Sequence, residues 1–329
     1  MADVAARAGV SISTVSHVLN GTRKVSPATL RAVQHAMEAV GYTPNILARA
    51  LARSTTNTIG LALSAVSNHY FSEIVRAIET ECTRHGLMIL LTDTHDDPAY
   101  ELKVVQALHQ RRVDGIILAP AADPAQRVLR YLADNRVPTV LIDRLVSDRF
   151  DQIGVENRDA TVDLVRHVIG HGHRRIGLIS GLAGLATTDE RVEGYRTALE
   201  EAGIPFDPAL VQSGASVVDP ARAACGALLD LESPPTAIVT ANNLMTIGAM
   251  HSLRDAGRRV PEDVALVGFD DFDWAECFSP RLTVMAQPCE QIGTRAADLL
   301  MQRLADPDGA RQTLRLRPAL RLRNSCGCR

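Results

Sequence analysis

From Thr58 almost to the end of the chain, short apolar runs alternate with longer amphipathic segments, and this alternation constrains the fold more than any other feature. Runs such as TIGLALS, VDGIILAP and VALVGFDD are rich in aliphatic residues, many of them β-branched, and predict buried strands. The segments between these runs repeat apolar residues at helical spacing. Strands that alternate with helices form βαβ units and a parallel sheet, so this region predicts an α/β fold.

The alternation occurs twice. One set of runs ends with VPTVLID, and a second set begins after Asn157 with RIGLISG and TAIVTA. Three segments remain outside these two sets: a strand-like run at 282–287, a helix at 289–304 and a last strand at about 313–322. A chain of 329 residues also exceeds the size at which one hydrophobic core usually keeps growing. We therefore expect two similar open parallel-sheet subdomains in tandem; two unrelated dinucleotide-binding-like domains are the alternative.

Composition gives no indication of a membrane or secreted protein. No apolar run approaches the roughly 20 residues that span a bilayer, and no signal peptide is recognised, so we expect a cytoplasmic protein with no membrane partner. Six scattered cysteines fit reduced thiols better than a disulfide framework. We interpret the terminal CGC at 326–328 as an exposed tail, and His171 and His173 as part of a turn at a helix end. No cofactor and no metal are expected.

The first 53 residues differ from the rest of the chain in charge. They carry six basic residues against two acidic ones, a net charge of +4, whereas the whole chain carries −3. A basic segment attached to an acidic body suits a small module that contacts phosphates.

The same segment predicts three short helices that bury their apolar faces on one another. Gly9 and Val10 separate the first two helices, and Ser11 is a good N-cap for the second. Ser26 caps the third helix, with Pro27 in its first turn. A helix-turn-helix places its second helix in the major groove of DNA, which the small polar side chains of this helix permit. A three-helix cap on an enzyme is the alternative.

These segments carry a family resemblance. DVAARAGVSISTVSHVLN, followed by VSPATLRAVQHAMEAVGYTPNILARAL, resembles the lactose/galactose repressor (LacI/GalR) family along its DNA-binding head. The resemblance implies a helix-turn-helix head at 1–43, a hinge helix and linker at 44–57, and an effector region of periplasmic sugar-binding type. Its two subdomains would comprise 58–156 plus about 286–308, and 157–285 plus about 309–329.

The resemblance also implies a homodimer on near-palindromic double-stranded operator DNA. Leu51 would enter the minor groove at the centre of the palindrome and kink the duplex. The DNA-binding residues expected from the exposed face of the second helix and from the family pattern are Ser11, Ile12, Ser13, Thr14, Ser16, His17, Asn20, Asn45, Ala48 and Leu51.

Two features depart from the family pattern. His17 stands where many members carry arginine. An arginine can donate two hydrogen bonds to guanine, whereas an imidazole offers one donor or acceptor, so we expect a different base preference at this position. Members also have a few more residues before the first helix, so either that helix is frayed here or the start of the protein lies upstream. Nothing after residue 322 resembles a tetramerising heptad helix, which favours a dimer.

Polar residues at predicted strand ends indicate where a ligand binds, because open α/β sheets bind ligands beyond the carboxyl ends of their strands. Asp143, Asn242 and Asp270 follow strands, and Arg191 belongs to the helix after RIGLISG. The resemblance adds Tyr70, Phe71 and Gln287. Arginine donors and aspartate acceptors suit vicinal hydroxyls, so the expected effector is a monosaccharide or related small polyol.

Two further departures concern this site. Ala215 lies where some members stack an aromatic side chain, and Asn243 stands where an aspartate is usual. Both departures leave a polyhydroxylated ligand possible and disfavour a stacked purine.

The sequence thus predicts a DNA-binding transcriptional repressor whose operator affinity changes with a sugar or sugar acid; induction and corepression both stay open. No nucleophile paired with a base is recognisable, which points away from catalysis. The alternative is an NAD-dependent or other small-molecule α/β enzyme with a helical cap, although SGLAGLA at 180–186 lacks the GxGxxG spacing. A sugar-binding transport protein would need a signal peptide and would have no DNA-binding head. An architectural DNA-binding protein would bind DNA without sequence preference.

Overall fold

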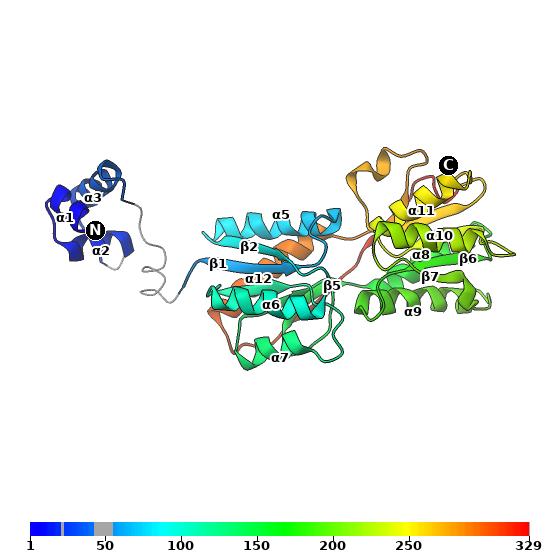
Figure 1. The fold of residues 1–329 in the computed structure, drawn as a ribbon, viewed down its shortest axis with the longest axis horizontal. Helices are drawn as coiled ribbons and strands as arrows, with labels where there is room; N and C mark the ends of the chain where they lie inside the picture. Colours follow the sequence, from blue (N-terminus) through cyan, green and yellow to red (C-terminus); the bar gives the residue numbers. More distant parts are fainter. Residues whose placement is uncertain (21–22, 43–54, 329) are drawn as a thin grey trace. The chain divides into compact units, whose positions relative to one another are not determined.

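The computed structural model describes residues 1–20, 23–42 and 55–328, with the side chain of Asn20 left out (Figure 1). The chain divides into two compact units, Met1–Asn57 and Thr58–Arg329. Each unit is described by itself.

The N-terminal unit contains three helices, α1 (Ala2–Ala8), α2 (Ile12–Asn20) and α3 (Pro27–Ala39). Val4, Val15 and Val33, one from each helix, are completely buried and form its core. The predicted caps are confirmed, because the Ser11 and Ser26 hydroxyls accept hydrogen bonds from the backbone N–H groups three residues later, each at 3.1 Å. The first helix is formed from Ala2 onward.

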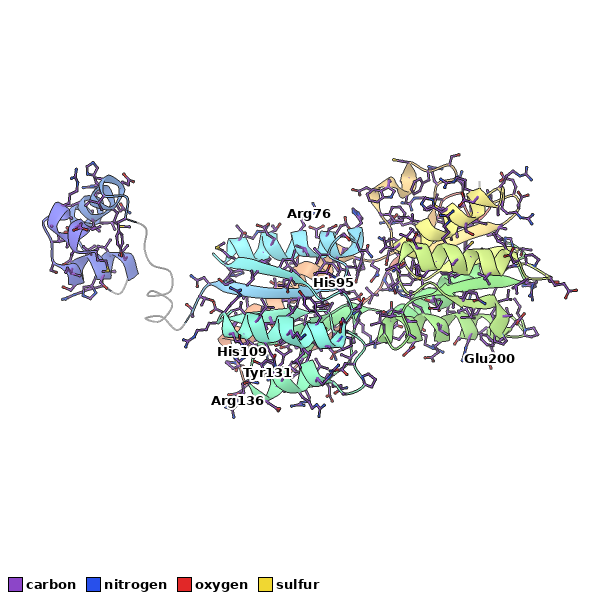
Figure 2. The ribbon with its side chains drawn as sticks, in the orientation of Figure 1. Arg76, His95, His109, Tyr131, Arg136 and Glu200 are labelled. Atoms are coloured by element: carbon purple, nitrogen blue, oxygen red, sulfur yellow. The ribbon has the colours of Figure 1, made fainter. Side chains whose placement is uncertain are left out.

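The second unit begins with a six-stranded parallel sheet in the order β11-β5-β4-β3-β1-β2. Helices α5 (His69–Arg84) and α12 (Cys289–Ala305) pack together on one face, and α6 (Pro98–Gln110) and α7 (Arg127–Asp134) cover the other (Figure 1). The strands are β1 (Thr58–Leu63), β2 (Met88–Asp93), β3 (Gly115–Leu118), β4 (Thr139–Ile142), β5 (Asp151–Val155) and β11 (Thr313–Leu316). On the outer face His109 of α6 and Tyr131 of α7 are hydrogen-bonded at 2.8 Å (Figure 2).

A second six-stranded sheet has the order β12-β10-β9-β8-β6-β7, parallel except for the antiparallel edge strand β12. Helices α8 (Asn157–Gly170) and α9 (Ala186–Glu201) pack together on one face, and α10 (Val218–Leu229) and α11 (Asn243–Asp255) on the other. The strands are β6 (Ile176–Ser180), β7 (Val211–Ser213), β8 (Ala237–Thr240), β9 (Ala265–Phe269), β10 (Thr283–Ala286) and β12 (Ala319–Arg321). Short 3-10 turns occur at Pro208–Leu210 and Asp273–Glu276. The predicted fold class is confirmed.

The chain crosses between the two sheets after β5, after β10 and again after β11. This last crossing differs from our prediction, which assigned everything after about 309 to the second subdomain and expected one strand at 313–322. Instead β11 extends the first sheet and β12 the second. Pro318, which has no N–H to donate, lies between the two strands and interrupts the ladder.

The end of the chain also differs from our prediction of an exposed tail. Cys326 is buried, because the preceding Ser325 is hydrogen-bonded to the beginnings of β9 and β10. The Leu266 N–H donates to the Ser325 carbonyl at 2.9 Å, and the Thr283 N–H donates to the Ser325 hydroxyl at 2.8 Å. Of the described helices, none has the length and apolar character needed to cross a bilayer.

Candidate functional site

Most of the predicted DNA-contacting residues lie on α2 or directly before it. Ser11, Ile12 and Ser13 are exposed, and 53% of the Ile12 surface is accessible, although a large aliphatic side chain is normally buried. Thr14, Ser16 and His17 are half-buried on the same helix. The side chain of Asn20 and the whole of Asn45, Ala48 and Leu51 fall outside the described residues.

The start of α2 carries a small cluster of hydroxyls. The Ser11 hydroxyl lies 2.8 Å from that of Ser13 and 2.9 Å from that of Thr14, and it also accepts the Thr14 N–H. Hydroxyl donors beside the positive end of a helix dipole suit a phosphate group. The geometry of α2 therefore fits contact with a DNA backbone near Ser11 and with bases further along the helix.

In the second unit, a cavity of about 290 Å³ lies between the carboxyl ends of the two sheets. Residues from both subdomains line it, including every effector-binding residue predicted from the sequence: Tyr70, Phe71, Asp143, Arg191, Asn242, Asp270 and Gln287. The two aspartates hold corresponding places. Asp143 follows β4 and Asp270 follows β9. Both residues have a left-handed backbone, with φ of 66° and 71° respectively. The backbone N–H of each donates a hydrogen bond of 2.9 Å to a carbonyl of the neighbouring strand.

The first subdomain contributes a buried polar group to the cavity. The Tyr70 hydroxyl donates to Asp143 at 2.7 Å, and burial together with that carboxylate raises the pKa of Tyr70 well above its usual value. The Arg144 Nε lies 3.4 Å from the other Asp143 oxygen. The same guanidinium donates to Asp96 and to the Ser64 hydroxyl, which fixes its orientation. Asp143 therefore lies between a phenol and a guanidinium.

The second subdomain contributes Arg191 and Asp270. Arg191 donates to the Asn157 side-chain oxygen at 2.9 Å and to the Ala241 carbonyl, and its guanidinium carbon lies 3.7 Å from the centre of the Phe269 ring. Burial raises the pKa of Asp270, and the nearby Arg191 charge only partly opposes this. Packing and hydrogen bonds thus fix both charged groups before any ligand binds.

One acceptor in the cavity wall has no hydrogen-bond partner among the described residues. Gln287 donates through Nε2 to Asp270 at 2.6 Å, whereas its buried Oε1 accepts nothing. A buried acceptor left unpaired is costly, and a donor on a ligand would satisfy it. Gln287 therefore points to a ligand that carries hydroxyl or amine donors.

A direct hydrogen bond joins the two subdomains beside the cavity. Asn243, the first residue of α11, donates to the side-chain oxygen of Asn68, the N-cap of α5, at 2.7 Å.

Asn242 lines the cavity, and both polar atoms of its side chain are already hydrogen-bonded within the protein. Its side-chain oxygen accepts the Met245 N–H at 2.8 Å and its side-chain nitrogen donates to the Ser216 carbonyl at 3.1 Å, so it acts mainly as a helix cap in the cavity wall.

Sequence reasoning missed several residues at or beside this site, among them Arg144, Asn157 and Asn68. Arg144 follows directly after the predicted Asp143, so a charged pair at a strand end was a usable signal. Asn157 and Asn68 open helices, and their roles depend on partners 34 and 175 residues away in the sequence. Local patterns contain no trace of such partners.

Comparison with known proteins identifies both units. Residues 1–45 match the family model described as bacterial regulatory proteins, lacI family, and residues 165–326 match the periplasmic binding protein-like domain. A protein of Vibrio atlanticus, the HTH-type transcriptional repressor PurR, is 34% identical over 321 residues, which cover 97% of this chain and 96% of that protein.

Solved structures agree with this assignment. The lac repressor dimer bound to operator and the anti-inducer ONPF is similar with a TM-score of 0.87 and 29% identity, over 98% of both chains. The transcriptional regulator CelR in complex with cellobiose is similar with a TM-score of 0.76 and 32% identity, again over 98% of both chains. These proteins are regulators, so the enzyme alternative is set aside. The chain belongs to the lacI family of bacterial regulatory proteins and is a DNA-binding transcriptional regulator.

Proposed function

We propose that this regulator is a homodimeric repressor whose operator affinity is controlled by a small polyhydroxylated effector, a monosaccharide or sugar acid, in the cavity between its subdomains. One observation carries the proposal: each subdomain presents a fixed aspartate and arginine to the same cavity. Asp143 and Arg144 come from one side, and Asp270 and Arg191 from the other. Carboxylates accept from vicinal hydroxyls, and guanidinium groups donate to hydroxyl or carboxylate oxygens.

The size of the cavity supports a single sugar ring. Its volume of about 290 Å³ lies just below the roughly 300–1,000 Å³ typical of ligand pockets. The unpaired Gln287 Oε1 favours a ligand with hydroxyl donors. CelR, a solved relative, is named as a complex with cellobiose. The small cavity argues for a smaller ligand than that disaccharide.

On the DNA side, Ile12, Ser13, Ser16 and His17 would contact base edges, while Thr14 and Asn20 would contact phosphates. Two copies related by a two-fold axis would occupy the halves of a near-palindrome, with Leu51 at its centre. The Asn68–Asn243 bond supports a link between effector and DNA, because a ligand in the neighbouring cavity would add contacts to both subdomains. Effector and operator affinities are then coupled reciprocally, whether the effector induces or corepresses.

The test has two parts on the full chain. Bound fragments are selected from a random duplex library at physiological salt, with and without a panel of pentoses, hexoses and aldonic acids. Calorimetry then measures the binding of each sugar and of purine bases. We expect a palindrome with a central pyrimidine–purine step, and a sugar that changes its recovery.

Asp270→Asn should weaken binding of that sugar at least tenfold, because a carboxylate acceptor is lost from a buried site. The matched control is Asp134→Asn, which changes an exposed aspartate on α7 and should leave sugar binding unchanged. Absence of an enriched sequence would refute the proposed DNA contacts. Binding of a purine with no binding of any polyol would refute the proposed effector class.

A further inference from the structure

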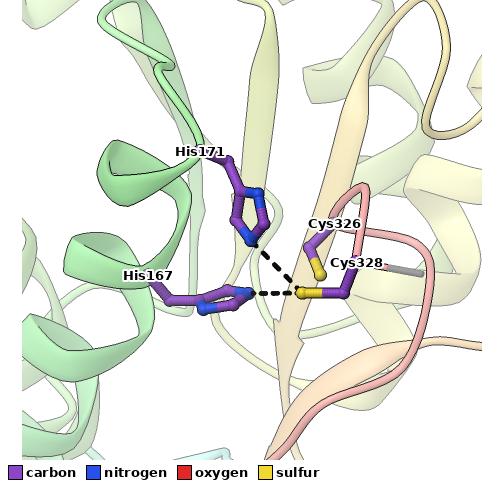
Figure 3. A group of neighbouring side chains, drawn as sticks. All are labelled: His167, His171, Cys326 and Cys328. Atoms are coloured by element: carbon purple, nitrogen blue, oxygen red, sulfur yellow. Dashed lines mark hydrogen bonds between the residues drawn. The ribbon is translucent and has the colours of Figure 1, made fainter.

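Four potential metal ligands meet where the end of the chain packs against α8. His167 lies in the last turn of α8 and His171 is the residue that caps this helix, and Cys326 and Cys328 approach them from the terminal segment (Figure 3). The Cys328 sulfur is 3.2 Å from His171 Nε2 and 3.6 Å from His167 Nε2. One ligand atom of each of the four residues lies within 4.8 Å of all the others.

We propose that these four side chains form a structural zinc site that fastens the end of the chain to α8. Two imidazole nitrogens and two thiolates are a donor set that binds zinc tetrahedrally, with bonds of about 2.0–2.3 Å and hence donor atoms roughly 3.3–3.8 Å apart. The two distances from Cys328 to the histidines already fall within or close to this range. The remaining ligand atoms lie within 4.8 Å of one another, so closing the site would shorten those distances by at most about 1.5 Å.

The protein holds both halves of the site in place. On the helix side, the i, i+4 spacing puts both histidines on one face, and their ring centres are 4.8 Å apart. On the chain-end side, Ser325 is bonded to β9 and β10, and the Cys326 sulfur lies 3.1 Å from the Thr283 hydroxyl. The spacing His-x3-His is typical of zinc ligands, while Cys-x-Cys is one residue shorter than the usual cysteine pair.

The sequence predicts a turn at a helix end for His171 and His173, and His171 indeed caps α8. It does not predict the cluster, because it places both cysteines on an exposed tail. His173 instead contacts the Thr236 hydroxyl at 2.9 Å and takes no part in the cluster. The two halves of the cluster are about 160 residues apart in the sequence, and only the fold brings them together.

The consequence of the site is local. Closing it would further fix the terminal segment at the beginnings of β9 and β10, to which Ser325 and Cys326 are bonded. Metal binding would then add to the stability of that subdomain, because a metal that binds the folded state alone shifts the folding equilibrium.

The experiment uses the full chain, kept reduced, stripped of metal with a chelator and reloaded with zinc chloride. After gel filtration, elemental analysis should find about one zinc ion per chain, and the melting temperature should exceed that of the stripped protein. Cobalt(II) in place of zinc should give sulfur-to-metal charge-transfer absorption. His171→Asn and Cys328→Ser each replace one metal ligand whose side chain is not fully buried. Both variants should therefore fold but lose most of the bound metal.

Two matched controls use the same substitutions elsewhere. His173→Asn lies two residues from the site, and Cys277→Ser changes an exposed cysteine. Both should retain wild-type zinc content. Equal zinc retention by the site and control variants, zinc content far below one ion per chain, or a cobalt spectrum without sulfur charge transfer would each overturn the proposal. None of these measurements depends on DNA or effector binding, so they test the zinc site independently of the proposed function.

Discussion

Arg303 and Asp151 form a buried ion pair that we expect to be among the most important polar contacts for stability. Arg303 Nε donates to Asp151 at 2.7 Å and Nη2 donates to the other carboxylate oxygen at 3.1 Å. The same guanidinium also donates to four backbone carbonyls in 306–310, the segment that leads from α12 towards β11. One side chain thus holds the start of β5 and the turn before β11.

Arg303→Met removes the cation and leaves the Asp151 carboxylate buried with the Gln312 N–H, 2.9 Å away, as a remaining partner. Breaking one side of a buried pair costs about 3–5 kcal/mol, a large fraction of the roughly 5–15 kcal/mol that stabilises a typical protein. For a unit of this size the melting temperature should fall by roughly 6–10 °C. Urea denaturation followed by circular dichroism measures the change in the free energy of unfolding.

Two further variants isolate the cause. Arg303→Met combined with Asp151→Asn removes both charges, and should be less destabilised than the sum of the single changes by at least about 1 kcal/mol. Arg166→Met breaks exposed ion pairs to Asp163 and Glu201, and should change stability by less than about 1 kcal/mol. If Arg303→Met proved as mild as Arg166→Met, or if the double variant showed no coupling, the reasoning from burial would be refuted.

The remaining predictions concern pH, closure and DNA. Burial raises the pKa of Glu101 from 4.5 to about 7, so the folded state holds this proton more tightly than the unfolded state, and stability should fall as pH rises through that range. Glu101→Gln should remove up to about 3 kcal/mol of that fall in pH-dependent urea denaturation; an unchanged slope would contradict it. Asn243→Ala removes the hydrogen bond to Asn68, which is worth about 1 kcal/mol, and should weaken sugar binding about fivefold as measured by calorimetry. The control Asn135→Ala changes an exposed asparagine and should leave sugar binding unchanged. His17→Arg should shift the half-site base selected from a random library, and an identical selected site would count against base contact by this residue.

Whether a site residue could be predicted from the sequence depends on how far along the chain its interaction partners lie. Ser11 and Ser26 cap helices through bonds to the backbone three residues away, so a short window of sequence contains both partners. Asp143 and Asp270 are visible because each follows a recognisable apolar strand. Local patterns therefore predicted the helices of the head and the strand ends that line the cavity.

Residues whose role depends on a distant partner were not predictable in this way. β5 begins with two polar residues, Asp151 and Gln152, so its sequence does not resemble a buried strand. The strand is nevertheless buried, because Arg303, 152 residues away, forms an ion pair with Asp151. β11 was placed in the wrong subdomain for a related reason. Its apolar alternation predicts a strand but does not contain the information about which of two similar sheets it joins.

The cavity and the crossings between subdomains share residues, and this bears on how an effector would act. Gln287 lies just after β10, where the chain crosses back to the first subdomain, and it donates to Asp270 in the cavity. Asn157 lies just after the first crossing and holds Arg191. A ligand that engages Asp270 and Arg191 therefore contacts side chains bonded to two of the three crossings. A ligand shifts a conformational equilibrium only by its difference in affinity for the two states. If the two subdomains rotate relative to one another, contacts at the crossings would change, and that difference would arise there.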